Sequence, residues 1–274
     1  MYSDYWQLNS APFENNVDTR FYFESESHHA SLLKLRYMIE NDKGAGLIVG
    51  GTGIGKTFVL NVLAESLEGA FGPFVHLVFP QMTPGELLAY LAAELGAREE
   101  TLRRDTAGLD RTIRTIQQQI QQYNTQGRHP VLLVDEAHMI EDQTTFQALR
   151  LLMNFQPIGL KFSLIFSGQT ELLSRIRRIP QLEERLGVKC ILRPMPYEET
   201  LGYIAHRIRM AGVSRALFTP DSLESIFELS GGIPRQVNRL CDLALLVGLA
   251  DNSEQVTADQ VEAVSEELTA LIVE

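Results

Sequence analysis

The chain has 274 residues, of which 45% are apolar and 22% charged. These are values of a folded globular protein, and the length suits one domain or one domain with a smaller second one. Acidic residues outnumber basic ones by 35 to 24, and the net charge of −11 argues against a non-specific nucleic-acid binder. The two cysteines lack C-x-x-C spacing, which excludes a disulfide framework and a cysteine-rich zinc site. The sequence has neither a secretory signal pattern nor an apolar run of about 18 residues, so we expect a cytoplasmic chain.

Apolar runs alternate with helical patterns over residues 1–196, which predicts βαβ units and a parallel sheet. The runs are continuous, as in strands covered by helices on both faces. Five strands are expected, at residues 46–50, 74–79, 131–135, 162–167 and 188–192. Helices are expected between them, at residues 57–67, 83–95, 109–123 and 143–155. Thr83 and Pro84 open the second of these helices as N-cap and first residue.

After Pro196 the pattern becomes purely helical. Helices are expected at residues 197–211, 220–229, 234–250 and 257–272. Residues 199–274 carry twelve acidic and five basic side chains, and we interpret this surplus as a solvated surface. The sequence therefore predicts an α/β domain over residues 1–196 and an all-α domain over residues 197–274.

A glycine-rich segment follows the first expected strand. Gly50 to Thr57 (GGTGIGKT) fits G-x-x-x-x-G-K-[ST], between a strand and a helix as the motif requires, which disfavours a chance glycine turn. Glycines let successive backbone N–H groups converge on phosphate oxygens, and the helix that follows adds its positive N-terminal end. Lys56 can reach the β- and γ-phosphates, and the Thr57 hydroxyl can bind Mg²⁺. The predicted nucleotide contacts are Gly51, Thr52, Gly53, Ile54, Gly55, Lys56, Thr57 and Phe58.

Two carboxylates, Asp135 and Glu136, end the third expected strand. In a parallel sheet this end lies at the same edge as the phosphate loop. We expect Asp135 to hold Mg²⁺ through water and Glu136 to accept a proton from the attacking water. His138 follows closely, and we expect it to be structural or solvent-facing rather than catalytic.

With these motifs the chain resembles the AAA+ ATPases, and more narrowly the ExeA/GspA group linked to bacterial type II secretion, which is related to the TniB/TnsC-type transposition ATPases. The closest similarity is in SGGIPRQVNRLCD, residues 230–242, which resembles the lid motif of that group. Further matches lie at residues 2–13, 27–35, 135–138, 149–154, 168–172, where Thr170 replaces a proline, and 198–212. The resemblance implies a P-loop AAA+ fold, in which helices sandwich a parallel five-stranded sheet and a small all-α lid follows.

The resemblance also implies roles for arginines and for the end of the fourth strand. Arg235 matches the sensor-2 arginine, which would contact the γ-phosphate from the lid. Arg185 lies where these ATPases carry an arginine finger that acts on a neighbouring subunit's nucleotide. The competing finger candidates are Arg175, Arg177 and Arg178. Ser167 and Gln169 both qualify as the sensor-1 residue, and the sequence leaves that choice open.

Adenine recognition needs an apolar slot. The resemblance places Pro12, Phe13 and the region near His29 on one side of this slot. Two lid residues, Ile204 and Ile233, would close the other side. The alternative for Phe13 is an ordinary core position.

The resemblance implies an ATP hydrolase that works with Mg²⁺ as a ring or filament of its own copies. It would drive assembly or remodelling of a partner complex in secretion or the cell envelope. We expect it in the cytoplasm, or at the cytoplasmic face of the inner membrane if the natural chain continues past Glu274. A switch that binds ATP without hydrolysing it is disfavoured, because no catalytic position is visibly degraded.

The alternative function is a DNA-associated ATPase of the transposition type, with DNA as the partner. Such a protein would need a basic stripe, for which the candidates are Arg98, Arg103, Arg104, Arg111 and Arg114. Nearby acidic residues, among them Glu99, Glu100, Asp105 and Asp110, nearly cancel that charge. The sequence therefore favours the secretion type.

Overall fold

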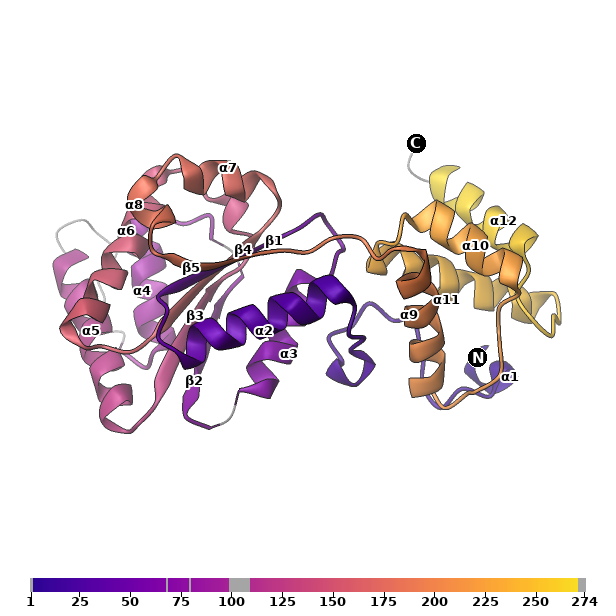
Figure 1. The fold of residues 1–274 in the computed structure, drawn as a ribbon, viewed down its shortest axis with the longest axis horizontal. Coiled ribbons are helices and arrows are strands. Elements are labelled where there is room, and N and C mark those ends of the chain that lie inside the picture. The colour runs from indigo at the N-terminus through magenta and orange to yellow at the C-terminus, as the bar shows by residue number, and fades with distance from the viewer. Residues whose placement is uncertain (1, 68, 79, 99–108, 271–274) are drawn as a thin grey trace. The chain divides into compact units, whose positions relative to one another are not determined.

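The computed structural model describes residues 2–67, 69–78, 80–98 and 109–270 (Figure 1). Their contacts group them into two compact units. The helical unit contains residues 1–26, 52–58 and 193–274, and the sheet unit contains residues 27–51 and 59–192. The domain division at residue 196 stays a prediction, since this grouping assigns the opening segment and part of the phosphate loop to the unit of the C-terminal helices.

The sheet unit is built on five strands, all paired in parallel in the order β2-β3-β4-β1-β5. The strands are β1 (Ala45–Val49), β2 (Phe71–Leu77), β3 (His129–Val134), β4 (Ser163–Gly168) and β5 (Leu186–Ile191). Every position of β1, β3 and β4 is buried, which explains why their sequences are mainly apolar. The predicted parallel five-stranded sheet is confirmed; of its expected residues, Phe79 lies outside the described ones.

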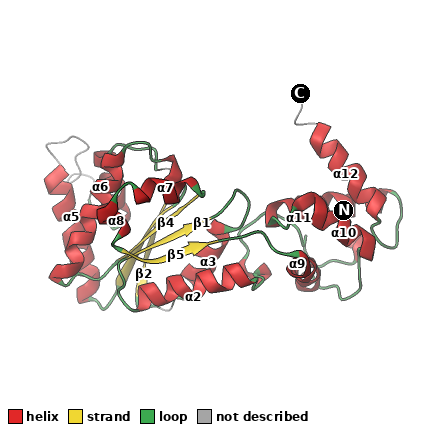
Figure 2. Ribbon diagram, turned by 45° about the horizontal axis from the view of Figure 1, so that its top comes forward, coloured by secondary structure: helices red, strands yellow, loops and turns green. Residues whose placement is uncertain are grey.

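Helices cover both faces of this sheet (Figure 2). They are α2 (Glu26–Glu40), α3 (Lys56–Ser66), α4 (Pro84–Glu94), α5 (Leu109–Thr125), α6 (Gln143–Leu152), α7 (Glu171–Arg177) and α8 (Pro180–Glu183), with 3-10 turns η4 (Ala137–Met139) and η5 (Met153–Ile158). Thr83 caps α4 as predicted, because its hydroxyl accepts from the Glu86 N–H while the Glu86 carboxylate accepts from the Thr83 N–H. The helix expected at 143–155 is α-helical only to Leu152 and then tightens into η5.

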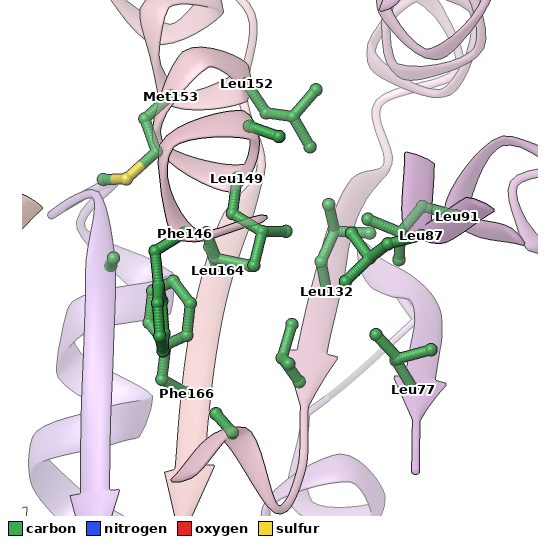
Figure 3. Packing of buried hydrophobic residues seen from close by; sticks show 14 of the residues in the cluster. Leu77, Leu87, Leu91, Leu132, Phe146, Leu149, Leu152, Met153, Leu164 and Phe166 are labelled. Atoms are coloured by element: carbon green, nitrogen blue, oxygen red, sulfur yellow. The ribbon is translucent and has the colours of Figure 1, made fainter. Parts of the chain in front are cut away.

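The main core of the sheet unit lies between one face of the sheet and helices α4 to α8. Figure 3 shows part of it, with Leu87 of α4 and Leu149 of α6 beside residues of the strands. Phe146 of α6 packs on Phe166 of β4 with ring centroids 6.1 Å apart. Each fully buried side chain of this size contributes about 1.5–3 kcal/mol. The opposite face is covered by α2, whose Leu35 and Met38 lie so close to Gly46 of β1 that a side chain there would clash.

The helical unit contains α1 (Tyr2–Trp6), η1 (Thr19–Phe21), α9 (Tyr197–Met210), α10 (Pro220–Ser230), α11 (Pro234–Ala250) and α12 (Ala258–Ala270). The four C-terminal helices confirm the sequence pattern, although Leu271 and Ile272 lie outside the described residues. The opening segment packs into the same core, since Trp6 is fully buried and its indole N–H donates to the Leu245 carbonyl at 2.9 Å. In the described part of the chain, no helix has both the length and the apolar character needed to cross a membrane.

Candidate functional site

The predicted site residues fall into two groups, one in each unit. The helical unit holds Pro12, Phe13, the loop residues 52–58, Ile204, Ile233 and Arg235. The sheet unit holds Gly51, Asp135, Glu136, Ser167, Gln169 and Arg185.

The phosphate loop joins the end of β1 to the start of α3. Gly53 and Gly55 adopt the left-handed backbone conformation, with φ of +74° and +97°, which L side chains rarely adopt. Helix α3 then begins at Lys56, which is buried, with Thr57 next to it. The first N–H groups of a helix have no partner within the helix, so this loop and helix start offer anion-binding donors. The residues present therefore fit a nucleotide phosphate chain.

The start of α11 lies directly against this loop. The Arg235 N–H donates to the Gly53 carbonyl at 3.2 Å, and a Cβ at Gly53 would lie 2.8 Å from the Cβ of Arg235 and 3.5 Å from a methyl group of Ile233. The Arg235 side chain is exposed, and its guanidinium has no hydrogen bond or ion pair among the residues that the structure describes. The structure thus brings together Gly53, Ile233 and Arg235, and leaves a guanidinium available beside the loop.

Two of the predicted adenine residues, Phe13 and Ile204, lie in the core of the helical unit, whereas Ile233 is half-buried and the region near His29 belongs to the sheet unit. Phe13 is 1% exposed and packs edge-on against Phe218, and Ile204 is equally buried in the same cluster. This environment is that of ordinary core residues, and their contact with adenine stays a prediction.

A buried arginine holds the segment that contains Pro12 and Phe13. Arg207 of α9 donates to the carbonyls of Pro12 and Glu14 and to the Tyr203 hydroxyl, at 2.7 Å for the last. The Tyr203 hydroxyl in turn donates to the side chain of Asn238 at 2.8 Å. Burial raises the pKa of Tyr203. Sequence reasoning placed Arg207 in the lid without assigning it any contact. Helix α9 carries two arginines, Arg207 and Arg209, and Arg207 is the buried one.

Phe58, the last predicted loop contact, is stacked on Tyr22 with ring centroids 6.2 Å apart. The Tyr22 hydroxyl is buried without a hydrogen-bond partner among the described residues, and burial raises the pKa of Tyr22 to about 12. Tyr22 was not among the predicted site residues. Its position shows that the opening segment reaches the start of α3 within the helical unit.

In the sheet unit, the two carboxylates follow β3 as predicted. The Asp135 side chain is 4% exposed, and its carboxylate lies 3.4 Å from the imidazole Nε2 of His76. Its other oxygen accepts the Glu136 N–H at 2.9 Å. His76, on the neighbouring β2, was missed; the signal was a polar residue inside the otherwise apolar run FVHLVF.

Glu136 is held in an uncommon backbone conformation next to His138. Its φ of +47° is in the left-handed region, which is unusual for a residue with a side chain and is often found at functional sites. The Glu136 carboxylate, 39% exposed, lies 3.2 Å from the Nδ1 atom of His138. The same Nδ1 accepts the Gln169 N–H at 3.3 Å. The structure therefore brings Glu136 and Gln169 to the same imidazole.

Both sensor-1 candidates lie at the end of β4. The Ser167 hydroxyl is buried and has no hydrogen-bond partner among the described residues. Gln169 follows the strand and is engaged through its backbone N–H. A buried hydroxyl without a partner is costly, and such groups often mark functional positions. This observation favours Ser167, and the assignment stays a proposal.

The finger candidate Arg185 lies between α8 and β5, where its guanidinium donates to the Asn154 side chain at 2.8 Å. Its competitor Arg175 is committed within its own chain, because its guanidinium donates to the Ile140 carbonyl at 2.5 Å. Arg177 and Arg178 are exposed. The structure does not bring Arg185 to the other predicted residues of the sheet unit.

Comparison with known proteins agrees with this geometry. General secretion pathway protein A of Aeromonas hydrophila is 28% identical over 275 residues, which cover 99% of this chain and 49% of that protein. The chain thus spans about half the length of this curated relative.

Solved structures share the fold at low sequence identity. ORC2 of Aeropyrum pernix, in ADPNP–ADP complexes, matches with a TM-score of 0.70 and 18% identity, over 94% of this chain and 71% of that one. Cdc6p of Pyrobaculum aerophilum matches with a TM-score of 0.71 and 15% identity, over 91% and 70%. The RuvB Holliday junction branch migration motor of Thermotoga maritima matches with a TM-score of 0.62 and 18% identity, over 94% and 74%.

A match to a family model identifies the family of this chain. Residues 39–176, just over half of the chain, match the model of the AAA domain family. This range contains the phosphate loop, both carboxylates and both sensor-1 candidates. The chain therefore belongs to the AAA domain family.

Proposed function

We propose that the chain hydrolyses ATP with Mg²⁺ as an oligomer and uses the energy to assemble or remodel a partner complex of bacterial secretion or the cell envelope. The observation that carries this proposal is the phosphate loop: two left-handed glycines followed by Lys56 at the start of α3. The similarity to a general secretion pathway protein over almost the whole chain supports the choice of pathway.

Nucleotide binding would be the work of the loop and helix start. The backbone N–H groups of residues 51–57 would donate to phosphate oxygens, and the Lys56 ammonium would add a point charge. Arg235 is well placed to add a second charge, because its backbone is bonded to Gly53 and its guanidinium is exposed. These roles of Lys56 and Arg235 would supply local positive charge for a polyanion in a chain whose net charge is −11.

Hydrolysis would depend on the carboxylates after β3. Asp135 and the Thr57 hydroxyl carry the oxygen ligands that Mg²⁺ prefers, and a bound Mg²⁺ would neutralise charge on the phosphates. Glu136 would take the proton of the attacking water, for which a half-exposed carboxylate is suited. Ser167 or Gln169 would sense the γ-phosphate, and Arg185 would act on the nucleotide of a neighbouring copy.

The site of action that we infer is the cytoplasmic side of the inner membrane, with a secretion or envelope protein as partner. This inference rests on the similarity to general secretion pathway protein A, about half of whose length the chain spans.

DNA is the alternative partner, and the observed charges do not favour it. Of the candidate arginines, Arg114 is ion-paired with Asp110 at 2.9 Å on α5. Arg103 and Arg104 lie outside the described residues, as do Glu99, Glu100 and Asp105. Fluorescence anisotropy of labelled duplex DNA, with and without ATP at low and high salt, tests this alternative. ATP-dependent binding that salt removes would favour it over the envelope function.

Two variants test the enzymatic part of the proposal. Lys56→Ala should weaken ATP binding about 10- to 150-fold, the loss expected for a charge-assisted hydrogen bond of about 1.5–3 kcal/mol. Glu136→Gln should keep ATP affinity and lose about 10²- to 10⁴-fold in kcat, because the amide cannot accept the proton. Calorimetric titration with ATP and phosphate release give both quantities. Parent affinity in Lys56→Ala, or parent turnover in Glu136→Gln, would contradict the roles assigned to these residues.

A further inference from the structure

The His138 Nδ1 atom, in the sheet unit, lies close to both a hydrogen-bond donor and a hydrogen-bond acceptor, and it can bond with only one of them at a time. The His138 Nδ1 accepts the Gln169 N–H at 3.3 Å and lies 3.2 Å from a carboxylate oxygen of Glu136. To bond with Glu136, Nδ1 must carry a proton. To accept from Gln169, Nδ1 must carry a lone pair instead. The two hydrogen bonds therefore exclude one another.

Contacts with the surrounding residues hold the His138 ring and the turn that carries Glu136 in place. The imidazole is only 16% exposed and packs on the end of β4, where a Cβ at Gly168 would lie 3.2 Å from Nδ1 and 3.1 Å from the His138 backbone nitrogen. The turn that carries Glu136 is closed by the Met139 N–H, which donates to the Glu136 carbonyl at 2.8 Å. Arg175 of α7 holds the end of this turn through the Ile140 carbonyl. Both possible partners of Nδ1 already lie within 3.3 Å of it in this one arrangement.

We propose that His138 is a positioning residue, which couples the orientation of the Glu136 carboxylate to the segment after β4 through its Nδ1 atom. With the proton on Nδ1, the imidazole donates to Glu136 and restrains its carboxylate. With the proton on Nε2, Nδ1 accepts the Gln169 N–H, and Glu136 is released to accept a proton from water. The proton leaves one ring nitrogen and reaches the other through solvent. This inference rests on the proposed role of Glu136 as the base, and it gives His138 the function that the sequence did not indicate.

Three substitutions distinguish this role from simple packing. Asn places its amide at the position of Nδ1, Gln places its amide at the position of Nε2, and Ala removes both. We expect His138→Asn to keep kcat within about threefold, and His138→Gln and His138→Ala to lower kcat about 10- to 100-fold, the cost of a misplaced catalytic group. The KM for ATP should stay within about twofold in all three, because His138 is assigned no contact with the nucleotide.

The controls separate failure of this inference from failure of the proposed function. If Glu136→Gln is inactive while His138→Ala turns over at the parent rate, the base is correct and the role of His138 is wrong. If Asn and Gln lose kcat equally, with unchanged thermal unfolding midpoints, the Nδ1 atom is not the coupling atom. If the parent chain has no ATPase activity, the base assignment and this inference both fail.

Nuclear magnetic resonance gives a readout that does not depend on turnover. In chains labelled with ¹⁵N-histidine, the signals of His138 are those that disappear in His138→Asn, among the six histidines of the chain. Glu136→Ala removes the acceptor, so the signals of His138 should move toward those of the Nε2–H tautomer. Unchanged Nδ1 and Nε2 shifts in Glu136→Ala would overturn the proposed contact.

Discussion

The two units both contain a polar cluster in an apolar setting, and the clusters differ in how completely they are bonded. In the helical unit, the Arg207 guanidinium uses its Nε and both Nη atoms, on the carbonyls of Pro12 and Glu14 and on the Tyr203 hydroxyl. In the sheet unit, the Ser167 hydroxyl has no partner among the described residues, and the His138 Nδ1 lies between a donor and an acceptor. The Arg207 guanidinium is therefore bonded on all three of its nitrogens, whereas the second group contains an unpartnered hydroxyl and a nitrogen with two competing contacts.

This difference indicates what each cluster does. A buried network in which every group is satisfied fixes a conformation and raises stability. A buried polar group without a hydrogen-bond partner lowers the free energy of unfolding, and such a group can still form a hydrogen bond with a ligand. We therefore expect substitutions in the Arg207 cluster to change the free energy of unfolding, and substitutions around the sheet edge to change activity. Four predictions test this contrast, in order of decreasing effect.

Arg185→Ala should have the largest effect, and only on activity. An arginine finger is worth about 10³- to 10⁵-fold in rate, or about 4–7 kcal/mol, while the lost bond to Asn154 is a partly exposed one. The variant should bind ATP and unfold like the parent, and the activity per subunit of the parent should rise with protein concentration. Mixing Arg185→Ala with an excess of Glu136→Gln should restore some phosphate release. Arg36→Ala removes an exposed arginine of α2 and is the control, which should keep the activity of the parent. If mixing restores no activity and the activity of the parent does not depend on protein concentration, Arg185 does not act on a neighbour's nucleotide.

Arg207→Ala should have the next largest effect, and on stability. It removes the donor from the buried Pro12 carbonyl, the buried Tyr203 hydroxyl and the partly buried Glu14 carbonyl, which should lower the free energy of unfolding by about 2–4 kcal/mol. Urea denaturation measures this loss. Arg209→Ala, on the exposed side of the same helix, should change the value by less than about 0.5 kcal/mol. Equal effects of the two substitutions would show that the Arg207 network is not what stabilises the helical unit.

Gly53→Ala should cost about 1–2 kcal/mol of stability, because an alanine at φ +74° is strained and its methyl would meet the Arg235 side chain. It should also weaken ATP binding, since the loop must shift. Gly69→Ala is the matched control, because a Cβ at Gly69 meets no atom within 4 Å. Urea denaturation and calorimetric titration give the two effects. Parent values of both in Gly53→Ala would show that the loop tolerates a side chain.

Substitution of His129 should have the smallest effect of the four, and that effect should be on how stability depends on pH. His129 is a buried polar residue of the sheet unit whose imidazole is hydrogen-bonded. Its imidazole contacts the Ser163 hydroxyl at 2.9 Å and the Asp42 carboxylate at 3.2 Å, and burial lowers its pKa below the ordinary value of 6.5 in spite of Asp42. The unfolded chain then binds the proton more readily, so stability is lost as the pH falls below about 6.5 toward the folded pKa.

His129→Gln should therefore flatten the dependence of the urea midpoint on pH between 7 and 5. One proton bounds the change in slope at about 1.4 kcal/mol per pH unit. A steeper loss of stability in the variant than in the parent, as the pH falls from 7 to 5, would contradict the lowered pKa of His129 in the folded chain.

The sequence determined the elements and the residues with local chemistry. Gly53, Gly55 and Lys56 could be predicted because the left-handed turns and the helix start depend on consecutive residues. Three of the strands, β1, β3 and β4, could be predicted because burial of every position makes them mainly apolar. The edge strands β2 and β5 are only partly buried, and each still carries an apolar run. Asp135 and Glu136 could be placed at the sheet edge for the same reason, since they directly follow such a run.

Only the tertiary structure decided which distant residues meet. His138 contacts the Gln169 N–H, 31 residues away, because β3 and β4 are neighbours in the strand order, which no local pattern encodes. Arg207 donates a hydrogen bond to the Pro12 carbonyl, 195 residues away, because the opening segment packs into the core of the C-terminal helices. The short helices α7 and α8 were missed as well, since a helix of fewer than two turns carries too few residues to show a periodicity. Local patterns reflect the environment of each residue along its own element, whereas these contacts depend on how separate elements pack to bury a shared apolar surface.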